Sequence, residues 1–169
     1  GVVDGTDREV EGVYNLLMAL LLQYFDEDDA QFQDLVGHLV QVVGDAQSST
    51  AMERSVIKYR VLANIFNMLS STSALRLAVF EALLALASVN GDMDFLEMAL
   101  KSLPTWLAQW NVSIEQKSAC LGRVAEALQT TDCRLEHIDK AYEFELLHLR
   151  FLSAEPSLPQ ELRHSAAEK

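Results

Sequence analysis

Signals for the start of a helix recur along this sequence at nearly regular intervals. Seven helices are predicted. The first, third, fifth and seventh begin near residues 6, 50, 92 and 132, which are 44, 42 and 40 residues apart. The second, fourth and sixth begin near residues 28, 73 and 113. Three starts have the form of a capping box, in which a hydroxyl residue precedes Glu or Gln by three positions: Thr6–Glu9, Thr50–Glu53 and Ser113–Gln116. Helix pairs that repeat every 40 to 47 residues or so are typical of HEAT-type arrays.

Turn-forming residues are too scarce for a fold of many short strands. Only 7 Gly and 3 Pro occur in 169 residues, of which 50% are apolar. The sequence therefore predicts an all-α fold over residues 1–155: a right-handed superhelical stack of antiparallel helix hairpins, HEAT/TPR-like, with about seven helices. Residues 156–169 are expected to form a tail or a short helix. A closed helical bundle is the alternative architecture.

The pattern of apolar residues predicts helices over about 6–24, 29–43, 50–69, 74–89, 92–110, 113–128 and 132–152. Gly44 and Gly91 are expected to follow helix ends, and Pro104 predicts a kink or a break. In the first helix, apolar residues spaced by three and four define the expected buried face: Val10, Val13, Leu17, Leu20, Leu21 and Tyr24.

The negative charge is concentrated near the start of the chain. Residues 1–53 contain eleven acidic residues and one base, Arg8, whereas the remainder contributes only −2 to the total of −12. Direct nucleic-acid binding through residues 1–53 is therefore not expected, and neither is binding to an anionic membrane. The acidic segment suits either a basic protein partner or simple solvation. Its candidate partner surface consists of Asp26, Glu27, Asp28 and Asp29.

Motifs for catalysis or cofactor binding are missing from the sequence. It has no P-loop, dinucleotide-binding glycine motif, nucleophile elbow, H-E-x-x-H or C-x-x-C, and Cys120 is expected in the core. Two E-x-x-H units, Glu145–His148 and Glu161–His164, leave a di-metal oxidoreductase as a remote alternative. The prediction is a protein that is not an enzyme and has no cofactor or metal. His38 and His137 are expected at the surface or at helix caps.

Two tryptophans and one asparagine are candidate structural or interface residues. Trp106 and Trp110 are four residues apart and share a helix face, so they either pack between the fifth and sixth helices or anchor a partner. Asn64 lies among apolar residues and is expected to make a buried hydrogen bond that fixes the register of its helix.

From the third to the sixth predicted helix, the sequence resembles the subunit M family of eukaryotic translation initiation factor 3, which are PCI-domain proteins. The resemblance depends mainly on Asn64-Ile65-Phe66, on the segment Arg76 to Phe80, and on Trp106-Leu107-Ala108-Gln109-Trp110-Asn111, followed by a helix that ends in Glu126-Ala127-Leu128. It adds Phe66, Arg76 and Asn111 to the candidate structural or interface residues.

The resemblance implies a non-catalytic, cytoplasmic scaffold subunit that binds other subunits of the initiation factor and supports recruitment of the small ribosomal subunit. In that family the helical repeats lead into a winged helix, and the present sequence is expected to lack it. Alternatives are a PCI scaffold of the proteasome lid or the COP9 signalosome, and a HEAT-type adaptor outside such assemblies.

Overall fold

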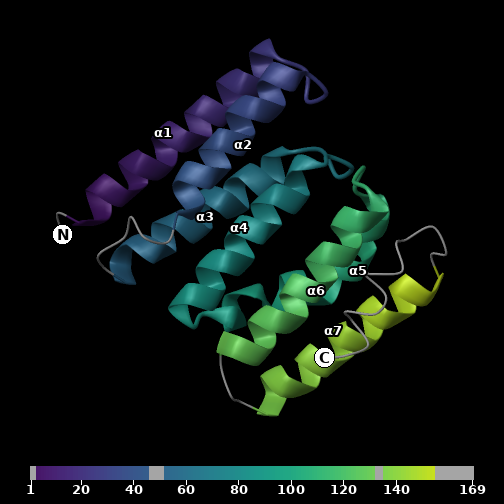
Figure 1. Ribbon diagram of the computed structural model, residues 1–169. Helices are drawn as coiled ribbons and strands as arrows, with labels where there is room; N and C mark the ends of the chain where they lie inside the picture. Colours follow the sequence, from purple (N-terminus) through teal and green to yellow (C-terminus); the bar gives the residue numbers. More distant parts are fainter. Residues whose placement is uncertain (1–2, 46–51, 132–134, 155–169) are drawn as a thin grey trace. The chain divides into compact units, whose positions relative to one another are not determined.

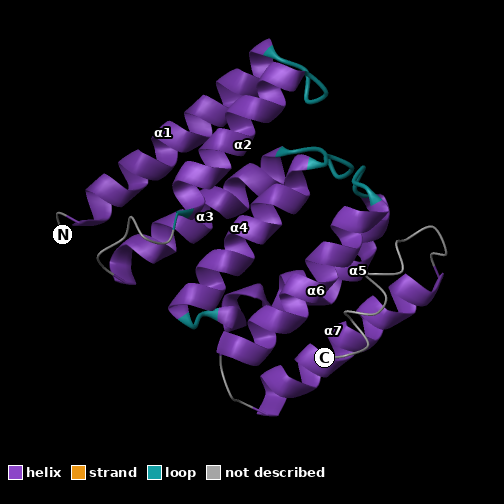
Figure 2. Ribbon diagram, in the orientation of Figure 1, coloured by secondary structure: helices purple, strands orange, loops and turns teal. Residues whose placement is uncertain are grey.

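The computed structural model describes residues 3–45, 52–131 and 135–154, and all the regular secondary structure of these residues is helical (Figure 2). The helices are α1 (Val3–Tyr24), α2 (Ala30–Gly44), α3 (Met52–Met68), α4 (Leu75–Asn90), the 3-10 helix η2 (Met93–Leu96), α5 (Glu97–Gln109), α6 (Ile114–Thr131) and α7 (Leu135–Ala154) (Figure 1). The predicted all-α fold of seven α-helices is confirmed over these residues.

The described residues form two compact units. The first contains the residues up to Leu86 together with Pro104–Asn111, and the second contains Ala87–Leu103 and the residues from Val112 onward. The chain passes from one unit to the other three times: within α4, within α5 and between Asn111 and Val112. Helices α4 and α5 are therefore each divided between the two units.

In the first unit, α1 and α2 both pack against α3. The core of this unit takes apolar side chains from each of its helices, among them a completely buried methionine of α1 and three buried phenylalanines. Its largest fully buried members are Met18, Phe32, Val36, Val61, Leu62, Ile65, Phe80, Leu86 and Trp110. Such close-packed apolar side chains supply most of the free energy that holds helices together.

In the second unit, α6 lies along α7 (Figure 1). The buried side of α6 includes Cys120, which confirms its predicted place in the core. Outside α6, the large buried residues of this unit come from the η2–α5 segment and from α7: Met93, Leu96, Leu100, Leu103, Phe144 and Leu152.

The capping box at the start of α6 is confirmed. The Gln116 amide N–H donates to Ser113 Oγ at 3.2 Å, and the Ser113 amide N–H donates to Gln116 Oε1 at 2.9 Å. These reciprocal bonds satisfy two N–H groups that a helix N-terminus otherwise leaves without partners. The predicted caps at Thr50 and Asp132 lie outside the described residues.

Two predictions for the first helix are wrong. Helix α1 begins at Val3, so Thr6–Glu9 lies within the helix instead of starting it. A capping sequence starts a helix only when the preceding backbone is not helical. The predicted buried face is also wrong, because five of its six residues are exposed and α1 instead buries Met18. The exposed five are Val10, Val13, Leu17, Leu20 and Tyr24.

The two glycines expected after helices behave differently. Gly91 has φ of 74°, a left-handed conformation that glycine adopts without strain, and it follows the last residue of α4 as predicted. Gly44, in contrast, is the last residue of α2. A Cβ atom built on Gly44 would lie 3.0 Å from Ala82 Cβ, so this glycine allows α2 and α4 to approach closely.

Pro104 lies inside α5, which is continuous from Glu97 to Gln109. Of the two predicted outcomes, a break at Pro104 is therefore wrong, and a kink stays a prediction. The predicted fifth helix is instead divided at its beginning, where η2 covers Met93–Leu96 and α5 starts at the next residue. Short 3-10 segments are frequent at the N-termini of α-helices.

Candidate functional site

Four aromatic rings meet in the first unit, one each from α3, α4 and α5 and one from Trp110, the residue that follows α5. Phe66 of α3 lies 5.0 Å from Trp106 and 6.0 Å from Trp110 between ring centroids. Phe80 of α4 lies 6.3 Å from Trp110, and the two indoles are stacked with centroids 6.0 Å apart. These separations lie in the range in which aromatic pairs stabilise a protein beyond simple burial. We call these four residues the aromatic cluster.

Arg76 of α4 joins this cluster at Phe66. Its guanidinium carbon lies 4.6 Å from the centroid of the Phe66 ring, in cation–π geometry, and Nη2 donates a hydrogen bond to the Leu69 carbonyl at 2.7 Å. Burial lowers the pKa of Arg76 from its ordinary value, and the negative charge of Glu27 opposes that shift. The guanidinium nevertheless stays protonated at neutral pH, because arginine side chains are not deprotonated in proteins.

Two buried polar atoms of this region have no hydrogen-bond partner among the described residues. They are Nε1 of Trp110, whose side chain is only 2% exposed, and Nε of Arg76. Each such donor without an acceptor costs about 1–3 kcal/mol relative to its hydrated state. Packing and ring contacts thus hold the cluster together and offset the free-energy cost of these two unbonded N–H groups.

The backbone at the end of α5 is tied to the turn between α3 and α4. The Trp110 N–H donates to the Trp106 carbonyl at 2.9 Å, and the Asn111 N–H donates to the Thr72 carbonyl at 2.9 Å. The residue Asn111 is itself exposed. The candidates Phe66, Arg76, Trp106 and Trp110 thus contact one another, with Asn111 immediately beside them.

The structure shows the ring partners of the two tryptophans. The sequence left open whether the indoles pack between the fifth and sixth helices or anchor a partner, whereas the ring partners lie on α3 and α4. Trp110 is buried and Trp106 is half-buried, so only Trp106 offers part of its ring to a partner.

Asn64 lies apart from the aromatic cluster and connects α3 to α1. Its Nδ2 donates to Glu11 Oε1 at 2.9 Å and to Asn15 Oδ1 at 3.1 Å. The side chain is half-buried. This polar contact determines which face of α1 lies against α3, because turning α1 would leave the Asn64 amide without these two acceptors.

In the acidic segment Asp26–Asp29, one of the four carboxylates is bonded within the chain. Glu27 accepts hydrogen bonds from the Ser70 amide at 2.9 Å and from its hydroxyl at 3.0 Å, so it helps to close the end of α3. Asp26, Asp28 and Asp29 are exposed. The segment therefore offers three of its four carboxylates to solvent.

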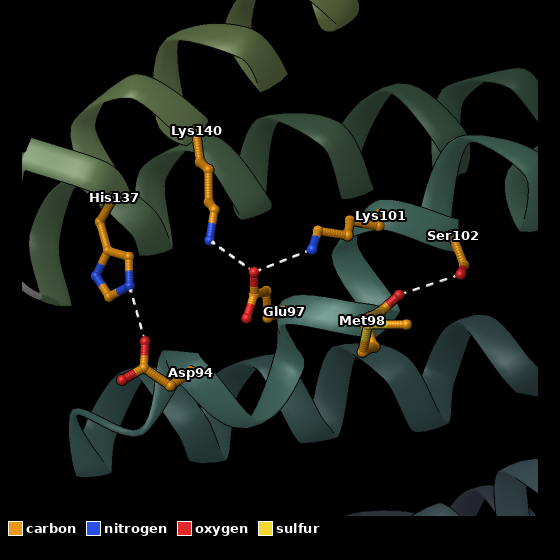
Figure 3. Close-up of polar contacts among 7 residues, drawn as sticks. All are labelled: Asp94, Glu97, Met98, Lys101, Ser102, His137 and Lys140. Atoms are coloured by element: carbon orange, nitrogen blue, oxygen red, sulfur yellow. Dashed lines mark hydrogen bonds and ion pairs between the residues drawn. The ribbon is translucent and has the colours of Figure 1, made fainter.

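Figure 3 shows a polar network between the η2–α5 segment and α7 in the second unit. The Glu97 carboxylate lies 3.0 Å from Lys101 Nζ and 3.7 Å from Lys140 Nζ. The hydrogen bond and the charge of Lys101 lower the pKa of Glu97, and the charge of Lys140 contributes. His137 is buried, with Nε2 3.2 Å from Asp94 Oδ1, so the prediction that it lies at the surface or at a cap is wrong.

The second histidine of this unit, His148, lies between α6 and α7. Its Nε2 is 2.8 Å from Ser118 Oγ, and a Cβ added at Gly122 would lie 3.3 Å from the imidazole Cε1 atom. Burial lowers the pKa of His148. In the E-x-x-H unit that contains it, Glu145 bonds to Gln129 and His148 to Ser118.

No group of three or more potential His, Cys, Asp or Glu ligands lies close enough to hold a metal within the described part of the chain. The second E-x-x-H unit, Glu161–His164, lies outside the described residues. The described arrangement therefore supplies no support for the di-metal alternative.

Sequence reasoning missed an exposed apolar stripe on α1. Its members recur at intervals of three and four residues and are Val10, Val13, Leu16, Leu17, Leu20 and Tyr24. The signal that could have revealed it is the apolar character of both sides of this helix, since Leu16 to Leu22 form an almost unbroken apolar run. One side meets α3 and the other is left exposed.

Within the described ranges, none of the helices is both long enough and apolar enough to cross a membrane.

Packed α-helices, together with an interior of aromatic and aliphatic side chains, define the class of protein over the described residues: an all-α protein. No protein-family model matches the chain, and no solved structure matches it.

About four fifths of the chain is similar in sequence to subunit M of eukaryotic translation initiation factor 3. The subunit from Dictyostelium discoideum is 28% identical over 132 residues, which cover 78% of this chain and 31% of that protein. The human subunit is 27% identical over 142 residues, and that of Danio rerio is 28% identical over 142 residues, each match covering 83% of this chain and 36% of the relative. The chain thus spans about a third of the length of these relatives and contains a region like subunit M.

Proposed function

We propose that this chain is a helical-repeat region of a subunit of eukaryotic translation initiation factor 3, and that it acts as a non-catalytic scaffold. The observation that carries the proposal is the similarity to subunit M over about four fifths of the chain, in relatives as distant as Dictyostelium discoideum and human. Its partners are other subunits of that complex. Through them it supports recruitment of the small ribosomal subunit in the cytoplasm.

The structure supports a scaffold role because its stable parts are packed helices. In the first unit, α3 is covered by α1 and α2 and contributes Phe66 to the aromatic cluster. Helices held in this way present fixed surfaces to a partner without large changes in shape. Such surfaces suit an assembly of many subunits.

The residues on which the family resemblance depends are mostly structural in this proposal. Phe66 and Trp110 are buried and Arg76 is bonded to the Leu69 carbonyl, so these three hold the first unit together. Asn111 is exposed and Trp106 is half-buried, so both are accessible to a partner.

Affinity purification of the full-length protein, with identification of the chains that accompany it, tests the proposal. Subunits of initiation factor 3 and small-subunit ribosomal proteins are expected. A matched deletion of the residues of this chain from the full-length protein should reduce the recovery of at least one of those subunits. Recovery of proteasome-lid or signalosome subunits instead would refute the assignment, and a single partner outside such assemblies would favour an adaptor.

A further inference from the structure

The apolar stripe on α1 is too exposed to be explained by folding of this chain. Val13 is 65% exposed, Leu16 is 61% exposed and Tyr24 is 74% exposed. Together with Val10, Leu17 and Leu20 they form one continuous row along the helix, because residues three and four apart are neighbours on a helix surface. Scattered exposed apolar residues are ordinary on a protein surface, whereas a contiguous row of six marks an interaction site.

The position of α1 is fixed by groups on its other side. Met18 is completely buried, and Glu11 and Asn15 both accept hydrogen bonds from Asn64 of α3. Rotating α1 to bury the stripe would expose Met18 and break both bonds. The stripe is therefore held outward by the same contacts that attach α1 to α3.

Exposed carboxylates lie next to the stripe at both of its ends. Glu9 is exposed one residue before Val10, and Asp26, Asp28 and Asp29 are exposed just beyond Tyr24. Arg8 is the single base among residues 1–53 of the sequence. A binding segment that carries Lys or Arg beside its apolar positions would have complementary charge.

We propose that the stripe on α1 is a docking surface for an amphipathic helix of a partner protein, with apolar residues at intervals of three and four and Lys or Arg at the flanking positions. An apolar row of this length matches the face that such a helix presents. The proposal rests on the proposed function only for the identity of the partner, which would then be another subunit of the complex.

A second copy of this chain is a poor occupant of the same surface. Two stripes in contact would bring together two segments that each carry a net charge of −10 over residues 1–53, eleven acids and one base. Like charges placed close together oppose association. A basic partner helix removes this repulsion and gains attraction from the same carboxylates.

Two synthetic helical peptides of about 20 residues, long enough to follow the stripe, provide a direct probe. Both carry leucine at intervals of three and four; one has lysine at the flanking positions and the other glutamate. Binding of each to the full 169-residue chain is measured by fluorescence anisotropy at several salt concentrations. We expect the lysine peptide to bind about tenfold more tightly or better at low salt, and the difference to shrink as salt rises.

Substitutions separate the stripe from other apolar surface. Val13→Glu and Leu16→Glu should each weaken binding of the lysine peptide by about tenfold or more, since each removes an apolar contact. Val42→Glu, on α2 of the same unit and 50% exposed, is the matched control and should leave binding unchanged. Circular dichroism checks that each variant is folded; should Leu16→Glu fail, Leu16→Ser replaces it. Charge reversal with Asp28→Lys and Asp29→Lys should flatten the salt dependence.

Three results would overturn the proposal. Equal binding of the two peptides would remove the charge argument, and binding that Val13→Glu and Leu16→Glu leave intact would place the peptide elsewhere. Self-association in analytical ultracentrifugation that Leu16→Glu abolishes would make a second copy the occupant. Binding that occurs only after residues 155–169 are deleted would make that segment the occupant instead.

A photo-crosslinker at Leu16 of the full-length protein, with Val42 as the control position, tests the same surface in cells. A crosslinked segment rich in Lys and Arg and with helical apolar spacing supports the proposal, and an acidic or non-helical segment refutes it. Affinity purification that fails to recover initiation-factor subunits would reject the proposed function, but the peptide measurements would still decide the chemistry of the stripe.

Discussion

Replacement of Trp110 by alanine tests whether the aromatic cluster is the structural centre of the first unit. The indole is 2% exposed and has three ring neighbours, with centroids at 6.0 Å, 6.3 Å and 6.0 Å. Truncation of a buried tryptophan to alanine costs about 3–5 kcal/mol. Trp110 contributes less to the free energy of unfolding than a tryptophan whose Nε1 is hydrogen-bonded, because a buried N–H without an acceptor costs about 1–3 kcal/mol. We therefore expect a loss near the lower end, about 3 kcal/mol.

Tryptophan fluorescence during urea unfolding is the suitable assay for this unit. The chain has 2 Trp residues, Trp106 and Trp110, and both belong to the first unit. In Trp110→Ala the remaining indole of Trp106 still lies beside Phe66, so the same signal follows the variant. Linear extrapolation of the unfolding free energy then gives the difference from wild type.

Two further variants make the result diagnostic. Trp110→Phe keeps an aromatic ring in the cluster and removes the unpartnered N–H, so it should cost about 1.5 kcal/mol or less. Val42→Ala, at a residue of the first unit that is 50% exposed, is a surface control and should change stability by about 0.5 kcal/mol at most. A loss below about 1 kcal/mol for Trp110→Ala would refute the structural role of this residue, as would a larger loss for Trp110→Phe than for Trp110→Ala.

Three other measurements follow from the local contacts. Combined replacement of Ser113 and Gln116 by alanine removes the reciprocal hydrogen bonds at the start of α6, and thermal unfolding should show a loss of about 1 kcal/mol. Gly44→Leu should destabilise the chain by about 1–3 kcal/mol in denaturant titrations, because even a Cβ atom at this position would lie 3.0 Å from Ala82 Cβ. Gly37→Ala should instead stabilise it by about 0.4–1 kcal/mol, because a Cβ atom added there has nothing within 4 Å. Burial lowers the pKa of His148, so the unfolded chain takes up a proton at this residue more readily than the native one. The free energy of unfolding should therefore fall as the pH drops below about 6.5. This dependence should weaken in His148→Gln but not in the exposed control His38→Gln.

Local chemistry predicted those features that depend on a few neighbouring residues. The Ser113–Gln116 box forms because both partners lie within one turn, and Gly91 follows α4 because glycine tolerates the left-handed conformation there. The regular spacing of helices was predictable for the same reason, since each start and stop signal acts over a few residues. The Thr6–Glu9 box failed because it cannot exclude a helix that begins further upstream, at Val3.

Contacts between distant residues were not predictable from periodicity alone. The face of α1 that meets α3 is chosen by Met18 and by the bonds from Asn64 to Glu11 and Asn15, which come from another helix. Both sides of α1 are apolar, so the spacing of its leucines is compatible with either face being buried. The same limit applies to Trp110, whose partners Phe66 and Phe80 precede it by more than one helix.

The residues that carry the resemblance to subunit M and those of the proposed docking surface are therefore different. The W-x-x-x-W-N segment is similar to the initiation-factor family, but its Trp110 is buried and fixes the interior of the first unit. The most exposed residues of the α1 stripe, Val13, Leu16 and Tyr24, contribute little to folding in contrast, because apolar surface left in water gains no burial free energy. Six apolar residues held outward in a row are thus explained better by binding than by stability. A substitution that changes binding without changing stability should accordingly be sought at Val13 and Leu16, and one that does the reverse at Trp110.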